Sequence, residues 1–203
     1  LMQDMHDGVG SALISSLVMV EKGDAPPANL AEVLRDCVDE LRLVIHSLEP
    51  VAHDLTTLLA SLRERIGKRL ETSGIRLVWH MDDIPPLPWL EAPQALQILR
   101  IVQESLANVL KHAGATEVCI RASMEDGMGE YVVVCVTDNG KGFDAATDIP
   151  GRGIKNLRAR AEKLGGKISI DTAPGKGCAL TLWLPLAGVE KSSEALCMAL
   201  SST

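Results

Sequence analysis

The chain has 203 residues, of which 46% are hydrophobic and only 2% aromatic, and its formal net charge is −7. This length and composition support a packed aliphatic core in one large domain, or in a small domain and a medium one. The acidic balance argues against a general nucleic-acid-binding protein, which needs a basic face to displace counterions. No run approaches the roughly 18 apolar residues of a membrane-spanning helix, and no signal peptide is visible.

The cysteines form no Cys-x-x-Cys pair, and four of the five lie within apolar helix or strand patterns. We therefore expect buried, reduced core thiols and a cytoplasmic location. The chain enters a helical pattern at its first residues. We expect a fragment whose upstream sensory region is missing, and any contact with the inner membrane would run through that region.

The first fifty residues predict a helical hairpin. Apolar residues recur every three or four positions over residues 1–22 and again over residues 30–48, with a Gly- and Pro-rich break between them and Pro50 at the end. Such a hairpin cannot bury two wide apolar stripes alone. We expect residues 1–50 to form a homodimer, in which two hairpins make a four-helix bundle.

The rest of the chain predicts an α/β layer with a mixed sheet, so the whole is an α+β protein. The patterns indicate helices over 55–72, from Pro93 to about His112 and over 154–164, and strands over 75–81, 118–124, 131–137, 167–172 and 178–185. The continuous apolar run of 131–137 predicts a strand covered on both faces. We expect domains at 1–50 and 51–187, followed by a loose C-terminal tail at 188–203.

Polar residues on the predicted helix 93–112 are spaced for metal and phosphate. Glu104, Asn108 and either Lys111 or His112 are three or four positions apart, which places them on one helix face. Carboxylate and amide oxygens suit Mg²⁺, which keeps several other positions for water or nucleotide phosphates. A solvated polar helix face is the simpler interpretation of this segment taken alone.

A second candidate group follows the strand 131–137. Asp138 ends that strand, where a carboxylate needs a hydrogen-bonding partner, and the amino group of adenine is a suitable donor. Gly140 and Gly142 permit close approach of the backbone to a base or a phosphate. An ordinary strand-to-loop turn also explains an Asp-Asn-Gly sequence.

Two further glycine pairs come later in the chain. Gly151 and Gly153 lead directly into the predicted helix 154–164, whose N-terminal N–H groups attract phosphate. Residues 143–150, which precede that pair, have the composition of a mobile lid. The second pair consists of Gly175 and Gly177.

In order and spacing, these segments resemble the N, G1, G2 and G3 boxes of the Bergerat-fold ATPases, in particular the catalytic domain of sensor histidine kinases. They are residues 103–113, 138–142, 151–157 and 175–177. The resemblance implies an α/β sandwich that binds ATP and Mg²⁺. It implies that Asn108 ligates Mg²⁺ with help from Glu104, and that Asp138 recognises adenine by accepting a hydrogen bond from its amino group. The phosphate side would be lined by Lys111, His112, Gly142, Gly151 and Gly153.

His6 and Asp7 lie on the first predicted helix, beside its apolar stripe. A neutral imidazole can attack phosphorus while a carboxylate accepts the other ring proton, although a lone helix histidine is more often simply solvated. The segment resembles the H-box of histidine kinases whose motif reads His-Asp or His-Glu. The resemblance extends to about residue 187. It implies a dimeric kinase that transfers the γ-phosphoryl group of ATP to His6 and then to an aspartate of a response regulator, which alone would contact DNA.

Two positions depart from the family pattern. Ser11 stands where a Gln linked to dephosphorylation of the regulator is often found, so we expect weak or absent phosphatase activity. Cys178 stands where Thr is frequent. Two alternatives remain open from the sequence: a nucleotide-binding dimeric scaffold without phosphotransfer, and another ATPase or protein kinase of the Bergerat fold.

Overall fold

The computed structural model describes residues 53–125, 131–144 and 152–187, together with Val38 and Leu41. The chain divides into two compact units, Leu1–Pro50 and Val51–Thr203. In the first unit, Val38 and Leu41 are helical, and their exposed fractions are 44% and 39%. The predicted hairpin, its bundle, most of the predicted lid and the C-terminal tail lie outside the described residues.

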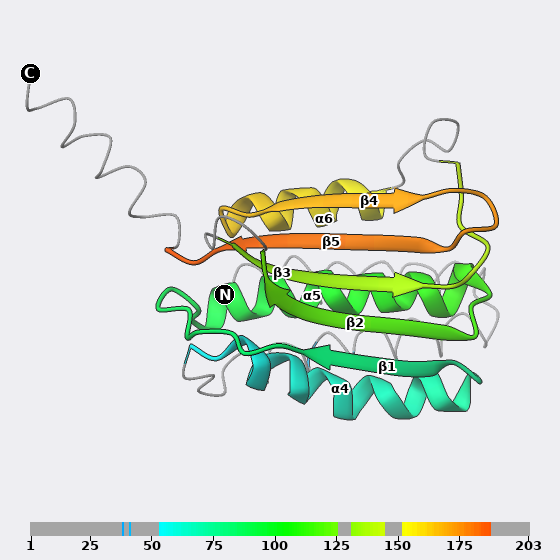
Figure 1. The fold of residues 1–203 in the computed structure, drawn as a ribbon, viewed down its shortest axis with the longest axis horizontal. Helices are drawn as coiled ribbons and strands as arrows, with labels where there is room; N and C mark the ends of the chain where they lie inside the picture. The colour runs from blue at the N-terminus through cyan, green and yellow to red at the C-terminus, as the bar shows by residue number, and fades with distance from the viewer. Residues whose placement is uncertain (1–37, 39–40, 42–52, 126–130, 145–151, 188–203) are drawn as a thin grey trace, which may run out of the picture. The chain divides into compact units, whose positions relative to one another are not determined.

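The second unit is built on a five-stranded mixed sheet with the order β1-β2-β3-β5-β4. The strands are β1 (Arg76–Met81), β2 (Glu117–Met124), β3 (Tyr131–Asp138), β4 (Lys167–Thr172) and β5 (Cys178–Pro185). Strand β1 is parallel to β2, and all other pairs are antiparallel. The order confirms the predicted α/β sandwich with a mixed sheet (Figure 1).

Three helices accompany the sheet: α4 (Leu55–Thr72), α5 (Ala92–Asn108) and α6 (Arg152–Lys163). Figure 1 shows α5 and α6 behind the sheet and α4 beside β1. Helix α5 has Pro93 in its first turn, as predicted, and is buried without interruption over residues 95–102. Helix α6 buries only Leu157 and Ala161 and is otherwise mostly charged, which is the pattern of a helix with one face on a core.

The expectation that residues 131–137 are covered on both faces is wrong. In β3, Val132, Val134 and Val136 are buried, whereas the intervening side chains are half-buried or exposed. Among the described elements, α5 and α6 lie on one face of the sheet, so the apolar run here forms a strand that these helices cover on that face (Figure 1). Part of the other face is covered by Lys167, whose Nζ lies 4.9 Å from the ring centre of Trp183 and 5.3 Å from that of Tyr131.

The expectation of buried cysteines is also wrong for the three that the structure describes. Cys119, Cys135 and Cys178 are free thiols, as expected, but each is only half-buried. Cys119 and Cys135 belong to the outer face of the sheet, because their register partners are Thr137 and Arg121 rather than core residues.

The start of the unit is fixed by side-chain hydrogen bonds. Asp54 caps α4, and its Oδ1 accepts from the backbone N–H groups of Thr56 (2.8 Å) and Thr57 (3.2 Å). Burial by itself would raise the pKa of Asp54, but hydrogen bonds from both threonines outweigh it and lower the pKa. Trp89 ties the Pro-rich linker to the end of β5, since its Nε1–H donates to the carbonyl of Pro185 at 2.8 Å.

Candidate functional site

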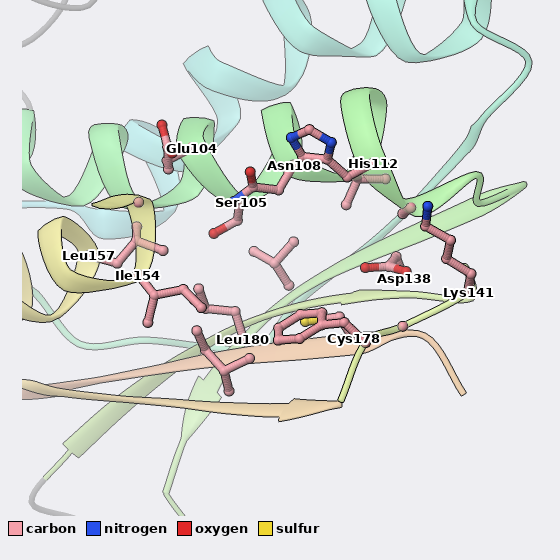
Figure 2. A pocket seen from close by; sticks show the side chains of 17 residues that line it. Glu104, Ser105, Asn108, His112, Asp138, Lys141, Ile154, Leu157, Cys178 and Leu180 are labelled. Carbon is pink, nitrogen blue, oxygen red and sulfur yellow. The ribbon is translucent and has the colours of Figure 1, made fainter. Parts of the chain in front are cut away.

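A cavity of about 530 Å³ opens between α5, the start of α6 and the ends of β3, β4 and β5 (Figure 2). This volume lies within the range of small-molecule and cofactor sites. Its walls are largely apolar, and a small set of polar groups converges on it. The apolar side chains are Val109, Ala113, Val136, Phe143, Ile154, Leu157, Ile170 and Leu180.

One wall of the cavity is the polar face of α5 and of the turn that follows it. Glu104, Asn108 and His112 line this wall at intervals of four residues. Residues Val109–Ala113 form a π-helical turn, which has more residues per turn than an α-helix. The fourth residue after Asn108 therefore stays on the same face and the third turns away. The structure thus places His112, and not Lys111, in the lining of this cavity.

The opposite wall carries a buried carboxylate. Asp138 is only 8% exposed, lines the cavity and accepts a hydrogen bond from the Gly140 N–H through Oδ1 at 2.8 Å. Figure 2 shows its carboxylate on the strand side, facing the helix that bears Asn108 and His112. A carboxylate that lines an apolar cavity is a specific acceptor for an N–H donor of a ligand.

Cys178 stands beside Asp138 in the same wall. The two residues are register partners on β5 and β3, and both line the cavity. Burial and, after it, the negative charge of Asp138 raise the pKa of the Cys178 thiol, against an opposing hydrogen bond with Thr172. This wall therefore places the acceptor oxygens of Asp138 next to a thiol whose pKa is raised.

The glycines hold the loops around the cavity close together. Gly142 and Gly177 have positive φ angles of 58° and 72°, and a side chain on either would collide with neighbouring backbone. A side chain on Gly140 would collide with the backbone of Ala113. Of the predicted glycines, Gly142 and Gly153 line the cavity, whereas Gly140, Gly175 and Gly177 do not. Gly151, His6 and Asp7 lie outside the described residues.

The oxygens near the cavity fit a magnesium ion only in part. Among the residues that the structure describes, no three His, Cys, Asp or Glu side chains gather closely enough to hold a metal. Asn108 and Glu104 line the same wall, and a Cβ on Gly153 would lie 3.0 Å from Glu104 Oε1, so the start of α6 approaches this carboxylate. Two oxygen side chains suit Mg²⁺ when phosphate oxygens complete its octahedron.

Several lining residues were not predicted. Lys141 and Phe143 belong to the sequence Asp-Asn-Gly-Lys-Gly-Phe, so that motif was a sufficient signal for both. Ile170 and Leu180 line the cavity as register partners on β4 and β5. Ile170 and Leu180 reach the cavity because β4 and β5 are neighbours in the sheet, and no local sequence pattern predicts that pairing.

The sequence profile described as "Histidine kinase-, DNA gyrase B-, and HSP90-like ATPase" matches residues 94–188. This range contains every residue that lines the cavity. The chain is 25% identical to "Sensor protein VraS" of Staphylococcus epidermidis over 95% of its own length and 56% of that protein. It is 28% identical to "Sensor histidine kinase YxjM" of Bacillus subtilis over 95% of its length and 48% of that protein. The chain therefore spans about half the length of these relatives.

Solved structures share the fold. The histidine kinase domain of the blue-light activated histidine kinase EL346 from Erythrobacter litoralis matches with a TM-score of 0.58 and 18% identity, over 91% of this chain and 93% of that one. The histidine kinase AdeS of Acinetobacter baumannii matches with a TM-score of 0.57 and 15% identity, over 89% and 98%. Among the described residues, no helix has the length and apolar character to cross a membrane.

Proposed function

We propose a complete function for the chain from the match of residues 94–188 to the histidine kinase-, DNA gyrase B- and HSP90-like ATPase family model. The chain is the catalytic core of a two-component sensor kinase, which uses ATP to phosphorylate its own His6. The phosphoryl group then passes to an aspartate of a response regulator. The relatives named sensor protein and sensor histidine kinase align with 95% of the chain, which supports a shared activity.

The observation that carries this proposal is the pairing of two opposed walls in one cavity. Asp138 supplies a buried acceptor for the amino group of adenine, and the apolar side chains of the lining, Phe143 among them, can pack against the base. Asn108, at the end of α5, and His112, in the π-helical turn that follows, face it, so the base and the phosphates of one nucleotide can meet different walls (Figure 2). Lys141 adds a positive charge to the lining.

Asn108 and Glu104 on α5 would supply two of the oxygens that hold Mg²⁺, phosphate oxygens would complete its coordination, and the bound ion would supply positive charge that neutralises those phosphate oxygens. His112 contributes a ring nitrogen to the same wall. Gly153 keeps the start of α6 free of side-chain bulk beside Glu104. Gly151 and the loop glycines Gly175 and Gly177 complete the proposed phosphate side, whereas Lys111 does not line the cavity and is expected to contribute little.

The transfer to His6 balances without a further reactant. A ring nitrogen of His6 forms a bond to the γ-phosphorus, the bond from that phosphorus to the bridging oxygen breaks, and ADP leaves with the electron pair. Asp7 accepts the proton of the other ring nitrogen. In the second step a regulator aspartate forms the new bond to phosphorus and the N–P bond of His6 breaks.

A homodimer through residues 1–50 completes the proposal. Val38 and Leu41 belong to the predicted apolar stripe, and both are helical and substantially exposed. Exposed apolar side chains that recur along one helix are typical of a surface that pairs with another chain. We propose that residues 51–187 form the ATP-binding domain and that the kinase acts in the cytoplasm.

The test is incubation with Mg²⁺ and ATP labelled in the γ-phosphate, using the wild-type chain, His6→Gln and Asn108→Ala. We expect acid-labile, alkali-stable label on the wild type and none on either variant. The variant His53→Gln is the matched control, because His53 does not line the cavity, and it should be labelled like the wild type.

Two results would overturn the proposal in different ways. Label that persists in His6→Gln would place the phosphoryl group on another residue. Tight ATP binding without label, in a chain tested with its regulator present, would favour a nucleotide-binding scaffold.

A further inference from the structure

Asn139 follows the buried carboxylate of Asp138, yet it does not line the cavity and is exposed. Its side chain nevertheless makes three hydrogen bonds to the segment that begins β2. Oδ1 accepts from the backbone N–H groups of Thr116 (2.9 Å) and Glu117 (3.0 Å), and Nδ2–H donates to Thr116 Oγ1 (2.9 Å). The backbone N–H of Asn139 also donates to the Glu117 carbonyl at 3.3 Å.

The segment that Asn139 binds comes directly after the polar wall of α5. The π-helical turn ends at Ala113, and Thr116 lies three residues further along. Two more contacts join the same pieces, because Gly140 packs on Ala113 and the Lys141 N–H donates to the Ala113 carbonyl at 2.9 Å. The loop 138–141 is thus docked on the end of the helix that carries the opposite wall.

Asn139 also lies within the turn that orients the carboxylate. Asp138 Oδ1 accepts from the Gly140 N–H, so residue 139 is the one between the carboxylate and its donor. Any rotation of the backbone at Asn139 moves this N–H relative to Asp138. The side chain that fixes residue 139 to β2 therefore fixes the direction of the carboxylate as well.

We propose that Asn139 is a positioning residue, which holds the Asp138 carboxylate at a fixed place opposite the α5 wall and so determines selectivity for a 6-aminopurine. This inference rests on the proposed function, in which Asp138 accepts from the adenine amino group. Its consequence is specific: loss of the Asn139 side chain weakens recognition of the amino group more than it weakens binding of the rest of the nucleotide.

The experiment compares dissociation constants for ATP and for purine riboside triphosphate, which lacks the 6-amino group, by calorimetry with Mg²⁺. In the wild type we expect ATP to bind at least about tenfold more tightly, the value of one hydrogen bond to a charged group. Asn139→Ala should lose most of this preference through weaker binding of ATP, while binding of the purine analogue changes little.

Two matched variants separate positioning from general damage. Asn139→Asp keeps an acceptor for the N–H groups of Thr116 and Glu117. We therefore expect this variant to retain the preference for ATP over purine riboside triphosphate that Asn139→Ala loses. Thr116→Val removes only the partner of Nδ2 and leaves both bonds to Oδ1, so its effect should stay within about threefold. Thermal melts without nucleotide establish that each variant is folded.

A double-mutant cycle with Asp138→Asn decides whether Asn139 acts through the carboxylate. If it does, Asn139→Ala has no further effect on the preference once the carboxylate is gone. Equal weakening of both nucleotides, or an additive effect in the Asp138→Asn background, would overturn the positioning role alone. A wild type without preference for ATP would instead overturn adenine reading by Asp138, and this inference with it.

Discussion

At the scale of single residues, the wall formed by Asp138 and Cys178 gives the site a chemical marker. Cys178 lines the cavity, whereas Cys119 and Cys135 lie on the other face of the sheet. A bound nucleotide would cover the first thiol and leave the other two open. The chain therefore carries its own internal controls for occupancy of the cavity.

We expect ADP with Mg²⁺ to slow the alkylation of Cys178 by N-ethylmaleimide by about tenfold or more, and to leave Cys119 and Cys135 unchanged. Only the thiolate reacts, and burial together with Asp138 raises the Cys178 pKa, so its rate at pH 7 should be low and should climb as pH rises. Peptide mass spectrometry over a time course measures all three rates. Equal protection of the three thiols would contradict this placement.

Residue types and spacing predicted much of the site. Glu104, Asn108 and Asp138 carry chemistry that is visible in a sequence, because amide and carboxylate groups stand at helix spacing or at a strand end. An ordinary turn also explains an Asn in an Asp-Asn-Gly sequence, whereas the three side-chain hydrogen bonds of Asn139 to the segment at the start of β2 depend on strand pairing. Local sequence contains no signal for such a contact.

At the scale of elements, the π-helical turn determines which of two neighbouring side chains, Lys111 or His112, lines the cavity. Sequence spacing allowed Lys111 or His112, because both lie near Asn108 on an α-helix. The insertion of a π turn is not encoded in any simple periodicity, so the choice needed the structure. Within residues 53–187, the boundaries of the described helices and strands were predicted closely, since the periodic segments there end at Gly, Pro or a change of period.

We expect His112→Ala to weaken ATP binding by about tenfold, and Lys111→Ala by less than about twofold, because His112 alone of the two lines the cavity. A fluorescent ATP analogue measures both constants under the same conditions. The reverse order of effects would show that the helix end turns differently when nucleotide is bound.

The cap of α4 gives a prediction about stability. Asp54→Ala should lower the free energy of unfolding by about 1 kcal/mol, the usual value of a lost N-cap, and Asp54→Asn by less. The folded-state pKa of Asp54 is lowered, so the charged cap contributes fully above its ordinary pKa. The stability difference between the wild type and Asp54→Asn should therefore vanish as the pH falls through the lowered pKa. Urea unfolding at a series of pH values from neutral to acid would measure this loss.

At the scale of the whole molecule, the proposed function gives the two units separable tasks. The described residues that line the cavity all lie between positions 104 and 180. Removal of the dimer surface should therefore leave nucleotide binding intact. Strand order is the feature at this scale that patterns did not predict, since β3 pairs with β5 and not with β4.

We expect Val38→Glu combined with Leu41→Glu to convert a dimer into a monomer, because each charge enters an apolar contact surface. Affinity for ATP should stay within about twofold of the wild type. Light scattering after size-exclusion chromatography gives the mass, and calorimetry gives the affinity. A variant that stays dimeric would place the dimer contact elsewhere.

The β2–β3 hairpin has one end at the cavity and its other end far from it. Asp138 pairs with Val118 at one end, and the Glu125 N–H donates to the Tyr131 carbonyl at the other. Eight residues of extended strand put these ends about 23 Å apart. The connection between Glu125 and Tyr131 is thus a place where a fluorescent protein or an epitope can be inserted. A tag inserted there would leave every residue that lines the cavity in its native sequence context.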